Sequence, residues 1–202
     1  MIIFLDFDGV LHPHDIENDE YTFSRVSFLW QILRSCPDAD VVFSTSWRIT
    51  YKFEEMLSFV TYGGGEDLEL RFIGATPSIV REKMSNKTGA ARREQECRLW
   101  LLGNGHQKTS WIAIDDNAVF FTDDCSALYL VDKEIGLTEA DVTNLITMIN
   151  HGFIEDELAE EKNKNRREFS QQIKDGLAKA TDASMFHGLR DEIKVKYGDE
   201  EY

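Results

Sequence analysis

Residues 1–13, MIIFLDFDGVLHP, lead from a short apolar run directly into two acids. The run Ile2–Leu5 contains no polar residue, which is typical of a parallel strand buried on both faces. Asp6 and Asp8 follow this run, and in extended backbone the ring of Phe7 between them points the opposite way. Because a carboxylate is costly to place at the end of a buried strand, we expect these two acids to belong to a functional site.

The first 150 residues alternate short apolar runs with stretches of helical periodicity. Apolar runs predict further strands at 39–44, 70–73, 111–114 and 128–131. Helical spacing predicts helices at 23–33, 49–60, 92–102 and 137–149, the last with Thr138 as its cap and Asp141 in its first turn. This alternation predicts an α/β fold: a doubly wound, mainly parallel sheet with helices on both faces and its site at the carboxyl ends of the strands.

Composition narrows the class of protein. The 202 residues are 42% hydrophobic, and no apolar run approaches the ~20 residues of a membrane-spanning helix. The first residues also lack the basic segment of a signal peptide. The three cysteines are odd in number and far apart, which favours buried free thiols in a reducing compartment over disulfides or a catalytic cysteine. We therefore expect a cytoplasmic protein without a membrane partner.

The formal net charge of −15 disfavours non-specific binding to nucleic acid but suits divalent cations. After about residue 154 the sequence becomes rich in Glu, Lys, Asn and Arg, with sparse apolar positions. We predict a domain at 1–152 and a charged helical C-terminal extension at 153–202. This extension either packs on the edge of the domain or mediates self-association or partner binding.

Polar side chains follow two more of the predicted strands. Ser44, Thr45 and Ser46 follow the second strand, while Asp115 and Asp116 follow the fourth. In a parallel sheet these ends meet the end of the first strand at one edge. Four converging carboxylates need a compensating cation, and Mg²⁺ prefers such oxygen ligands while keeping water for a substrate phosphate. The sequence therefore predicts a magnesium site suited to phosphoryl transfer.

Five segments together resemble one family. They are FLDFDGVLHP, VVFSTSWR, RREQECRLWL, WIAIDDN and GLTEADV, in this order. The set resembles the haloacid dehalogenase (HAD) superfamily, and most closely the capless HAD domains of bacterial Swiss Army Knife RNA repair proteins. The resemblance covers about residues 1 to 150. It implies a Rossmann-like core with little or no cap, Mg²⁺ as cofactor and phosphatase activity.

The resemblance also implies roles for individual residues. Asp6 matches the nucleophile that forms an aspartyl phosphate, and Asp8 matches the general acid and base. Gly9 lets the chain turn away close to the substrate. Thr45 matches the hydroxyl that binds a phosphoryl oxygen, with Ser44 as the alternative register. Further candidates for substrate binding are Ser46, Arg48 and Lys87.

For the metal, the resemblance implies Asp6, the backbone carbonyl of Asp8 and Asp115 as ligands, supported by Asp116. The cation of the third motif is best matched by Arg93, with Arg92 and Lys87 as alternatives.

Each motif also has a simpler explanation. Thr45 and Ser46 suit a helix cap, Asp115 and Asp116 an Asx turn, Arg48 a surface ion pair, and Trp47 core or lid packing. His12 and His14 suit a metal site or, more readily, a loop facing the substrate.

The gaps between the motifs are too short for a sizeable cap, so we expect an open site. An open site favours a phosphate on a macromolecule, such as a polynucleotide end or a phosphoprotein, over a small metabolite. Basic residues are concentrated in the central third of the chain and could line a groove: Arg48, Lys52, Arg81, Lys83, Lys87, Arg92 and Arg93. The alternatives are a catalytically idle HAD fold that acts as a binding module, or a small-molecule nucleotide or sugar phosphatase.

Overall fold

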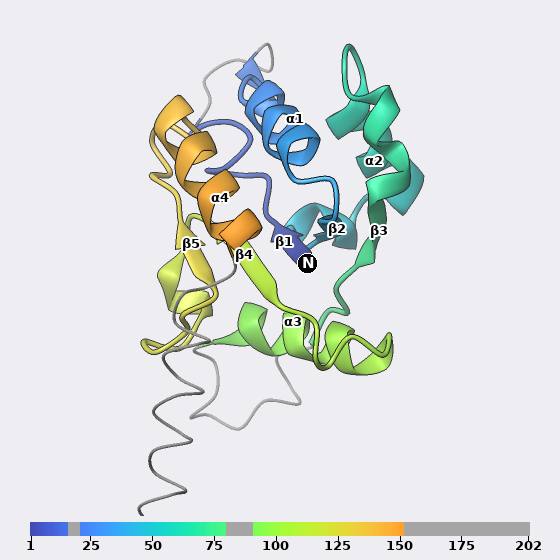
Figure 1. Ribbon diagram of the computed structural model, residues 1–202, viewed down its shortest axis with the longest axis vertical. Coiled ribbons are helices and arrows are strands. Elements are labelled where there is room, and N and C mark those ends of the chain that lie inside the picture. The colour runs from blue at the N-terminus through green and yellow to red at the C-terminus, as the bar shows by residue number, and fades with distance from the viewer. Residues whose placement is uncertain (16–20, 80–90, 152–202) are drawn as a thin grey trace, which may run out of the picture. The chain divides into compact units, whose positions relative to one another are not determined.

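The computed structural model describes residues 1–15, 21–79 and 91–151, and these form a five-stranded parallel sheet with helices (Figure 1). The strands are β1 (Ile2–Leu5), β2 (Asp40–Phe43), β3 (Phe72–Ala75), β4 (Trp111–Asp115) and β5 (Leu128–Leu130). Their order across the sheet is β3-β2-β1-β4-β5, and every neighbouring pair is parallel. The predicted α/β fold is confirmed, and the strand that precedes Asp6 lies at its centre.

Within the described ranges, four α-helices and three short 3₁₀ helices accompany the strands. The α-helices are α1 (Val26–Ser35), α2 (Phe53–Thr61), α3 (Arg92–Gly103) and α4 (Glu139–His151). The 3₁₀ helices are η2 (Ser46–Ile49), η3 (Glu66–Arg71) and η5 (Ala118–Phe120). The predicted cap of α4 is confirmed, because Thr138 and Asp141 each accept a hydrogen bond from the other's backbone N–H.

The sheet separates two hydrophobic cores, and β1 contributes to both. Ile3 and Leu5 face the larger core, which includes the buried sides of α1, α2 and α4. Ile2 and Phe4 point the other way, into a smaller core formed with α3. This alternation of side chains buries β1 completely, as its wholly apolar sequence predicts. Figure 1 accordingly shows α1 and α4 on one side of the sheet and α3 on the other.

Several predicted boundaries are wrong. The helix predicted at 23–33 begins at Val26, and two further errors have a common cause. The helix predicted at 49–60 begins at Phe53, because Thr45 starts a separate 3₁₀ helix and the backbone N–H of Lys52 donates to the Glu55 carboxylate at the first turn of α2. The strand predicted at 70–73 begins at Phe72, since Leu70 lies in η3 and is 93% exposed. In both cases the 3₁₀ helix contains apolar residues, and in the sequence these continue the apolar pattern of the neighbouring helix or strand.

The connections leave little room for a cap. Residues 6–25 link β1 to α1, and residues 76–91 link β3 to α3. Each is far shorter than the about 50 residues of the smallest ordinary domains. The predicted C-terminal extension and its boundary at 152/153 lie outside the described residues. Within the described ranges, no helix combines the length and apolarity that spanning a membrane requires.

The cysteines are free, as predicted. Cys36 and Cys97 are buried, each in one of the two cores. Cys125 is only partly buried. Burial raises the pKa of the Cys97 thiol well above its usual value, so this side chain remains protonated and serves as core packing.

Candidate active site

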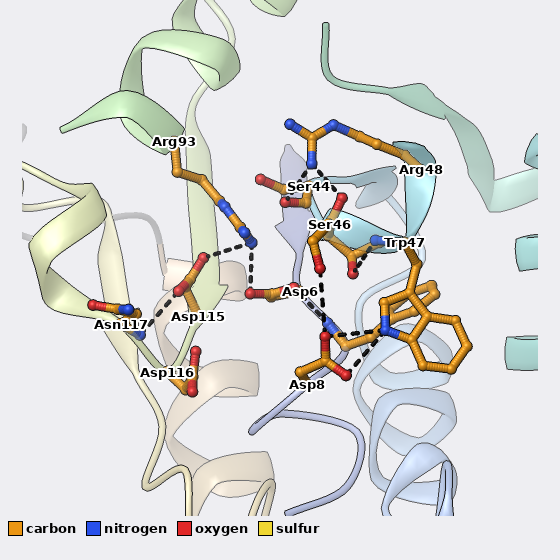
Figure 2. Close-up of polar contacts among 12 residues, drawn as sticks. Asp6, Asp8, Ser44, Ser46, Trp47, Arg48, Arg93, Asp115, Asp116 and Asn117 are labelled. Atoms are coloured by element: carbon orange, nitrogen blue, oxygen red, sulfur yellow. Dashed lines mark hydrogen bonds and ion pairs between the residues drawn. The ribbon is translucent and has the colours of Figure 1, made fainter. Parts of the chain in front are cut away.

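Asp6 lies at the carboxyl end of the central strand and is 5% exposed. Its Oδ1 accepts a hydrogen bond of 2.8 Å from the backbone N–H of Phe7, whose ring points into the core. Its Oδ2 lies 2.5 Å from Nη1 of Arg93 (Figure 2). Burial raises the pKa of Asp6, although attraction to Arg93 opposes this effect.

Arg93 comes from the first turn of α3 and joins two strand ends. Besides Asp6, its Nη1 contacts Oδ2 of Asp115 at 3.1 Å. The guanidinium also lies over the ring of Phe120, with 5.3 Å between Cζ and the ring centroid. Burial works against the charge of Arg93, but attraction to Asp6 and Asp115 outweighs it and raises the pKa. The cation candidate of the third motif thus lies against the nucleophile candidate.

Three carboxylates form a group that could hold a metal ion. Asp6, Asp115 and Asp116 each offer an oxygen, and these oxygens lie within 4.8 Å of one another. Oδ1 of Asp115 accepts a hydrogen bond of 2.9 Å from the backbone N–H of Asn117, which is the predicted Asx turn. This turn aims the second oxygen of Asp115 toward Asp6 and Arg93 (Figure 2).

The ionisation of this group favours a bound cation. Burial, together with the neighbouring negative charge of Asp6, raises the pKa of Asp115 to about 7. Burial also raises the pKa of Asp116. One guanidinium therefore does not fully compensate three neighbouring carboxylates. An all-oxygen set with uncompensated negative charge fits Mg²⁺.

Gly9 brings the backbone close to this group. Its φ of +69° lies in the left-handed region that favours glycine. A Cβ built at this position would lie 2.3 Å from Oδ2 of Asp116. Only a residue without a side chain therefore allows Asp116 to occupy its place beside Asp6 and Asp115.

Asp8 is held apart from the metal candidates by other side chains. Nε2 of His12 lies 3.2 Å from Oδ1, and Nε1 of Trp47 donates to both oxygens at 3.0 Å. Oγ of Ser46 lies 3.5 Å from Oδ2. The hydrogen bond with His12 lowers the pKa of Asp8, outweighing the effect of burial, and that from Trp47 adds to it. Figure 2 shows the indole of Trp47 directed at the Asp8 carboxylate.

The hydroxyl residues after β2 lie in different surroundings. Thr45 is fully buried and its Oγ1 accepts a hydrogen bond of 3.2 Å from the backbone N–H of Trp47. Thr45 therefore caps η2, one of the two roles that the sequence allows. Ser44 contacts Sγ of Cys97 at 3.7 Å in the smaller core. Of these two hydroxyls, that of Ser44 faces α3.

Arg48 is tied to the protein rather than open to solvent. Its Nη2 lies 2.6 Å from Oε2 of Glu96, and the two side chains are 7% and 2% exposed. The same guanidinium donates to the backbone carbonyls of Ser44, Thr45 and Thr76. Arg48 therefore fixes the turn after β2 against α3, and burial lowers its pKa.

The remaining basic candidates lie beside or beyond this site. Arg92 lies over the ring of Phe120, with 5.5 Å between Cζ and the ring centroid. Lys87 lies outside the described residues, as do Arg81 and Lys83. His14 is half exposed, and its Nδ1 lies 3.6 Å from Oδ2 of Asp116. A histidine of the loop thus borders the metal candidates.

Sequence reasoning missed the partners that hold the site together. The sequence indicates no role for Glu96, and it presents His12 only as a ligand or a substrate-facing residue. One signal was available for Glu96: Arg93, Glu96 and Cys97 lie at spacings of three and four on one face of a helix. The face of α3 that carries the buried Cys97 also carries two charged residues, and this combination indicates a buried polar network.

A family model described as the HAD domain in Swiss Army Knife RNA repair proteins matches residues 2–142. The chain belongs to this family. The match includes all five strands and the group of Asp6, Asp115 and Asp116. The HAD superfamily consists mostly of phosphohydrolases. Searches of curated proteins and of solved structures found no match to this HAD domain.

Proposed function

We propose that this HAD domain is a magnesium-dependent phosphomonoester hydrolase that forms an aspartyl phosphate on Asp6. The observation that supports this most is the position of Asp6. It is buried at the end of the central strand, pairs with Arg93, and shares a potential metal group with Asp115 and Asp116. Such an arrangement can bring a phosphoryl group and a carboxylate nucleophile together although both are negatively charged.

The proposed reaction has two steps. In the first, a carboxylate oxygen of Asp6 attacks phosphorus while the bond to the leaving oxygen breaks. Asp8, protonated beside the negatively charged phosphate of the substrate, gives that oxygen its proton. In the second, water attacks the phosphoryl group on Asp6 and loses a proton to Asp8. The bond between phosphorus and Asp6 breaks, phosphate is released, and both acids return to their initial state.

Asp6, Asp115 and Asp116, with the backbone carbonyl of Asp8, would hold the ion. When bound, Mg²⁺ supplies positive charge that stabilises the oxygens of the transferring phosphoryl group. Arg93 supplies the second positive charge from the first turn of α3, through contacts with Asp6 and Asp115. We expect the hydroxyl of Thr45 to contribute a hydrogen bond to a phosphoryl oxygen.

The proposed substrate carries its phosphate on an accessible end, such as that of a polynucleotide. Two observations support this proposal. Residues 6–25 and 76–91 are too short to form a cap domain that encloses a small metabolite. The family to which the chain belongs is named for RNA repair proteins. The net charge of −15 requires that contact with a polynucleotide be confined to the neighbourhood of the site.

The first test compares wild type with Asp6→Asn in the release of phosphate from 4-nitrophenyl phosphate, with and without Mg²⁺. We expect turnover to require Mg²⁺ and to fall at least about 1,000-fold in Asp6→Asn, since loss of a nucleophile removes the covalent route. Asp123→Asn makes the same chemical change on an exposed loop and should retain full activity. Equal activity in Asp6→Asn and Asp123→Asn would refute the proposed nucleophile.

A second test addresses the substrate. RNA oligonucleotides phosphorylated at the 5′ or the 3′ end are compared with a phosphoserine peptide and with mononucleotides, using kcat/KM as the measure. We expect an oligonucleotide end to be the best substrate. A mononucleotide or sugar phosphate preferred over every oligonucleotide would show a small-molecule phosphatase instead.

A further inference from the structure

The carboxylate of Asp8 forms hydrogen bonds with two aromatic side chains. The family resemblance gives neither of them a catalytic role. Trp47 donates its indole N–H to both oxygens at 3.0 Å, and Nε2 of His12 lies 3.2 Å from Oδ1. His12 comes from the loop after β1 and Trp47 from the turn after β2. Two segments that are distant in sequence therefore meet on this one carboxylate.

The surroundings of His12 determine which ring nitrogen carries the proton. Nδ1 accepts a hydrogen bond from the backbone N–H of Phe23 at 3.4 Å. A ring nitrogen that accepts a hydrogen bond carries no proton, so in the neutral ring the proton is on Nε2, which faces Asp8. His12 is therefore a donor to the Asp8 carboxylate, as Trp47 is.

The position of the His12 ring is fixed by packing. The side chain is 2% exposed and lies edge-on to Phe23 and Trp47, with ring centroids 5.5 and 6.2 Å away. Phe23, which donates to His12, has a φ of +60°, an unfavourable conformation for an aromatic residue. The fold thus accepts backbone strain at the residue that orients His12.

These hydrogen bonds distinguish the Asp8 carboxylate from the carboxylates that could bind a metal ion. Both oxygens of Asp8 are engaged by N–H donors, and its carboxylate is not in the group formed by Asp6, Asp115 and Asp116. Its side chain remains 33% exposed, so it is accessible to a substrate. A carboxylate that is oriented, accessible and free of the metal is suited to proton transfer.

We propose that His12 and Trp47 are positioning residues for Asp8, which hold its carboxyl group in the orientation for proton transfer. When Asp8 is protonated, Oδ1 can accept from both N–H groups while Oδ2 carries the proton for the leaving oxygen. This inference rests on the proposed function, in which Asp8 is the general acid and base. Neither His12 nor Trp47 touches the reacting atoms. Their effect is to keep Asp8 where the proton transfer described above can take place.

The test uses His12→Phe, which keeps an aromatic ring but removes both ring nitrogens, and His12→Gln, whose amide N–H can replace Nε2. The measure is kcat/KM with Mg²⁺ for phenyl phosphate and 4-nitrophenyl phosphate, because kcat/KM reports the step that expels the leaving group. Phenolate is the poorer leaving group and depends more on a general acid. His106→Phe, on the loop after α3, is the matched control.

We expect His12→Phe to lower kcat/KM for phenyl phosphate by about 10-fold to 100-fold, with a much smaller loss for 4-nitrophenyl phosphate. His12→Gln should recover most of the loss, and His106→Phe should show none. Equal losses on both esters would indicate a merely structural role and overturn the proposal, as would the absence of any loss. If His12→Phe does not fold, Trp47→Phe removes the other donor, with the same expectation and the same refuting outcomes.

The two proposals can fail separately. A wild-type protein that hydrolyses both esters, with variants in which the ratio of the two kcat/KM values is unchanged, would refute the positioning role and leave the proposed hydrolase intact. A folded, magnesium-loaded wild type that hydrolyses neither ester would refute both.

Discussion

At the scale of single residues, the contact between Gly9 and Asp116 depends on the absence of a side chain. The φ of +69° at Gly9 is one requirement, and the space beside Asp116 is a second. Gly63 meets the first of these requirements but not the second. Gly63 has a φ of +83°, but a Cβ built there meets no atom within 4 Å.

We therefore predict different outcomes for the same substitution at these positions. Gly63→Ala should cost only the strain of left-handed backbone, about 1–2 kcal/mol in the free energy of unfolding. Gly9→Ala should carry this cost and also displace Asp116, so that the affinity for Mg²⁺ falls by about 10-fold to 100-fold. Isothermal titration calorimetry with Mg²⁺ and urea unfolding measure the two effects. Equal Mg²⁺ affinity in both variants would contradict this account of Gly9.

At the scale of elements, α3 connects the strand ends that form the site. Its Arg93 contacts Asp6 after β1, and its Glu96 pairs with Arg48 after β2. Glu96 also accepts a hydrogen bond of 3.0 Å from the backbone N–H of Ile79 after β3. One face of this helix therefore holds three neighbouring strand ends in position.

The buried pair of Arg48 and Glu96 should be costly to break. Glu96→Gln removes the negative charge opposite a guanidinium that is 7% exposed, so we expect the free energy of unfolding to fall by about 3–5 kcal/mol. Asp67→Asn breaks the exposed pair with Arg34 and should change the free energy of unfolding far less, because solvent screens that pair. Urea denaturation of both variants measures the difference. Similar losses would show that burial of the pair has no energetic importance.

How far the sequence predicts this site differs from residue to residue. That Asp6 and Asp115 come together follows from uninterrupted apolar runs, since each residue ends a buried parallel strand. The partner of Arg48 could not be predicted, because it depends on how α3 is rotated about its axis. The burial of His12 depends on the path of a loop that has no periodicity. Strand ends are thus encoded locally, whereas the contacts between them arise only on folding.

At the scale of the whole molecule, the buried acids oppose folding unless they are neutralised. A formal net charge of −15 already opposes compaction, and Asp6 and Asp115 add buried negative charge at the centre of the sheet. Either protons or a cation can relieve this repulsion. Stability, pH and Mg²⁺ should therefore be linked.

The direction of the pH dependence follows from Asp115. Its pKa is raised to about 7 from 3.8, so in this window the folded protein holds a proton that the unfolded chain has lost. Stability without Mg²⁺ should therefore fall, on the order of 2–4 kcal/mol, as pH rises through the window, and level off above it. The lowered pKa of Asp8 acts in the opposite direction, but below pH 3.8.

Mg²⁺ competes with this proton, so its stabilising effect should be larger at about pH 8 than at about pH 5. The measurement is the rise in Tm on addition of Mg²⁺ at each pH. Asp115→Asn removes the titrating group and should flatten both the pH dependence and the response to Mg²⁺. The same rise in Tm at both pH values in the wild type would rule out a metal site that includes Asp115.

The central place of β1 has a consequence for the order in which the chain folds. Ile2 pairs with Asp40 on one side and with Trp111 on the other, so β1 needs β4, more than 100 residues later, to complete its hydrogen bonds. Contacts between residues so distant in sequence form late and slowly. The acids at the ends of β1 and β4 are therefore brought together by the closure of the sheet. Assembly of the three carboxylates that could hold a metal ion is then one of the last events of folding.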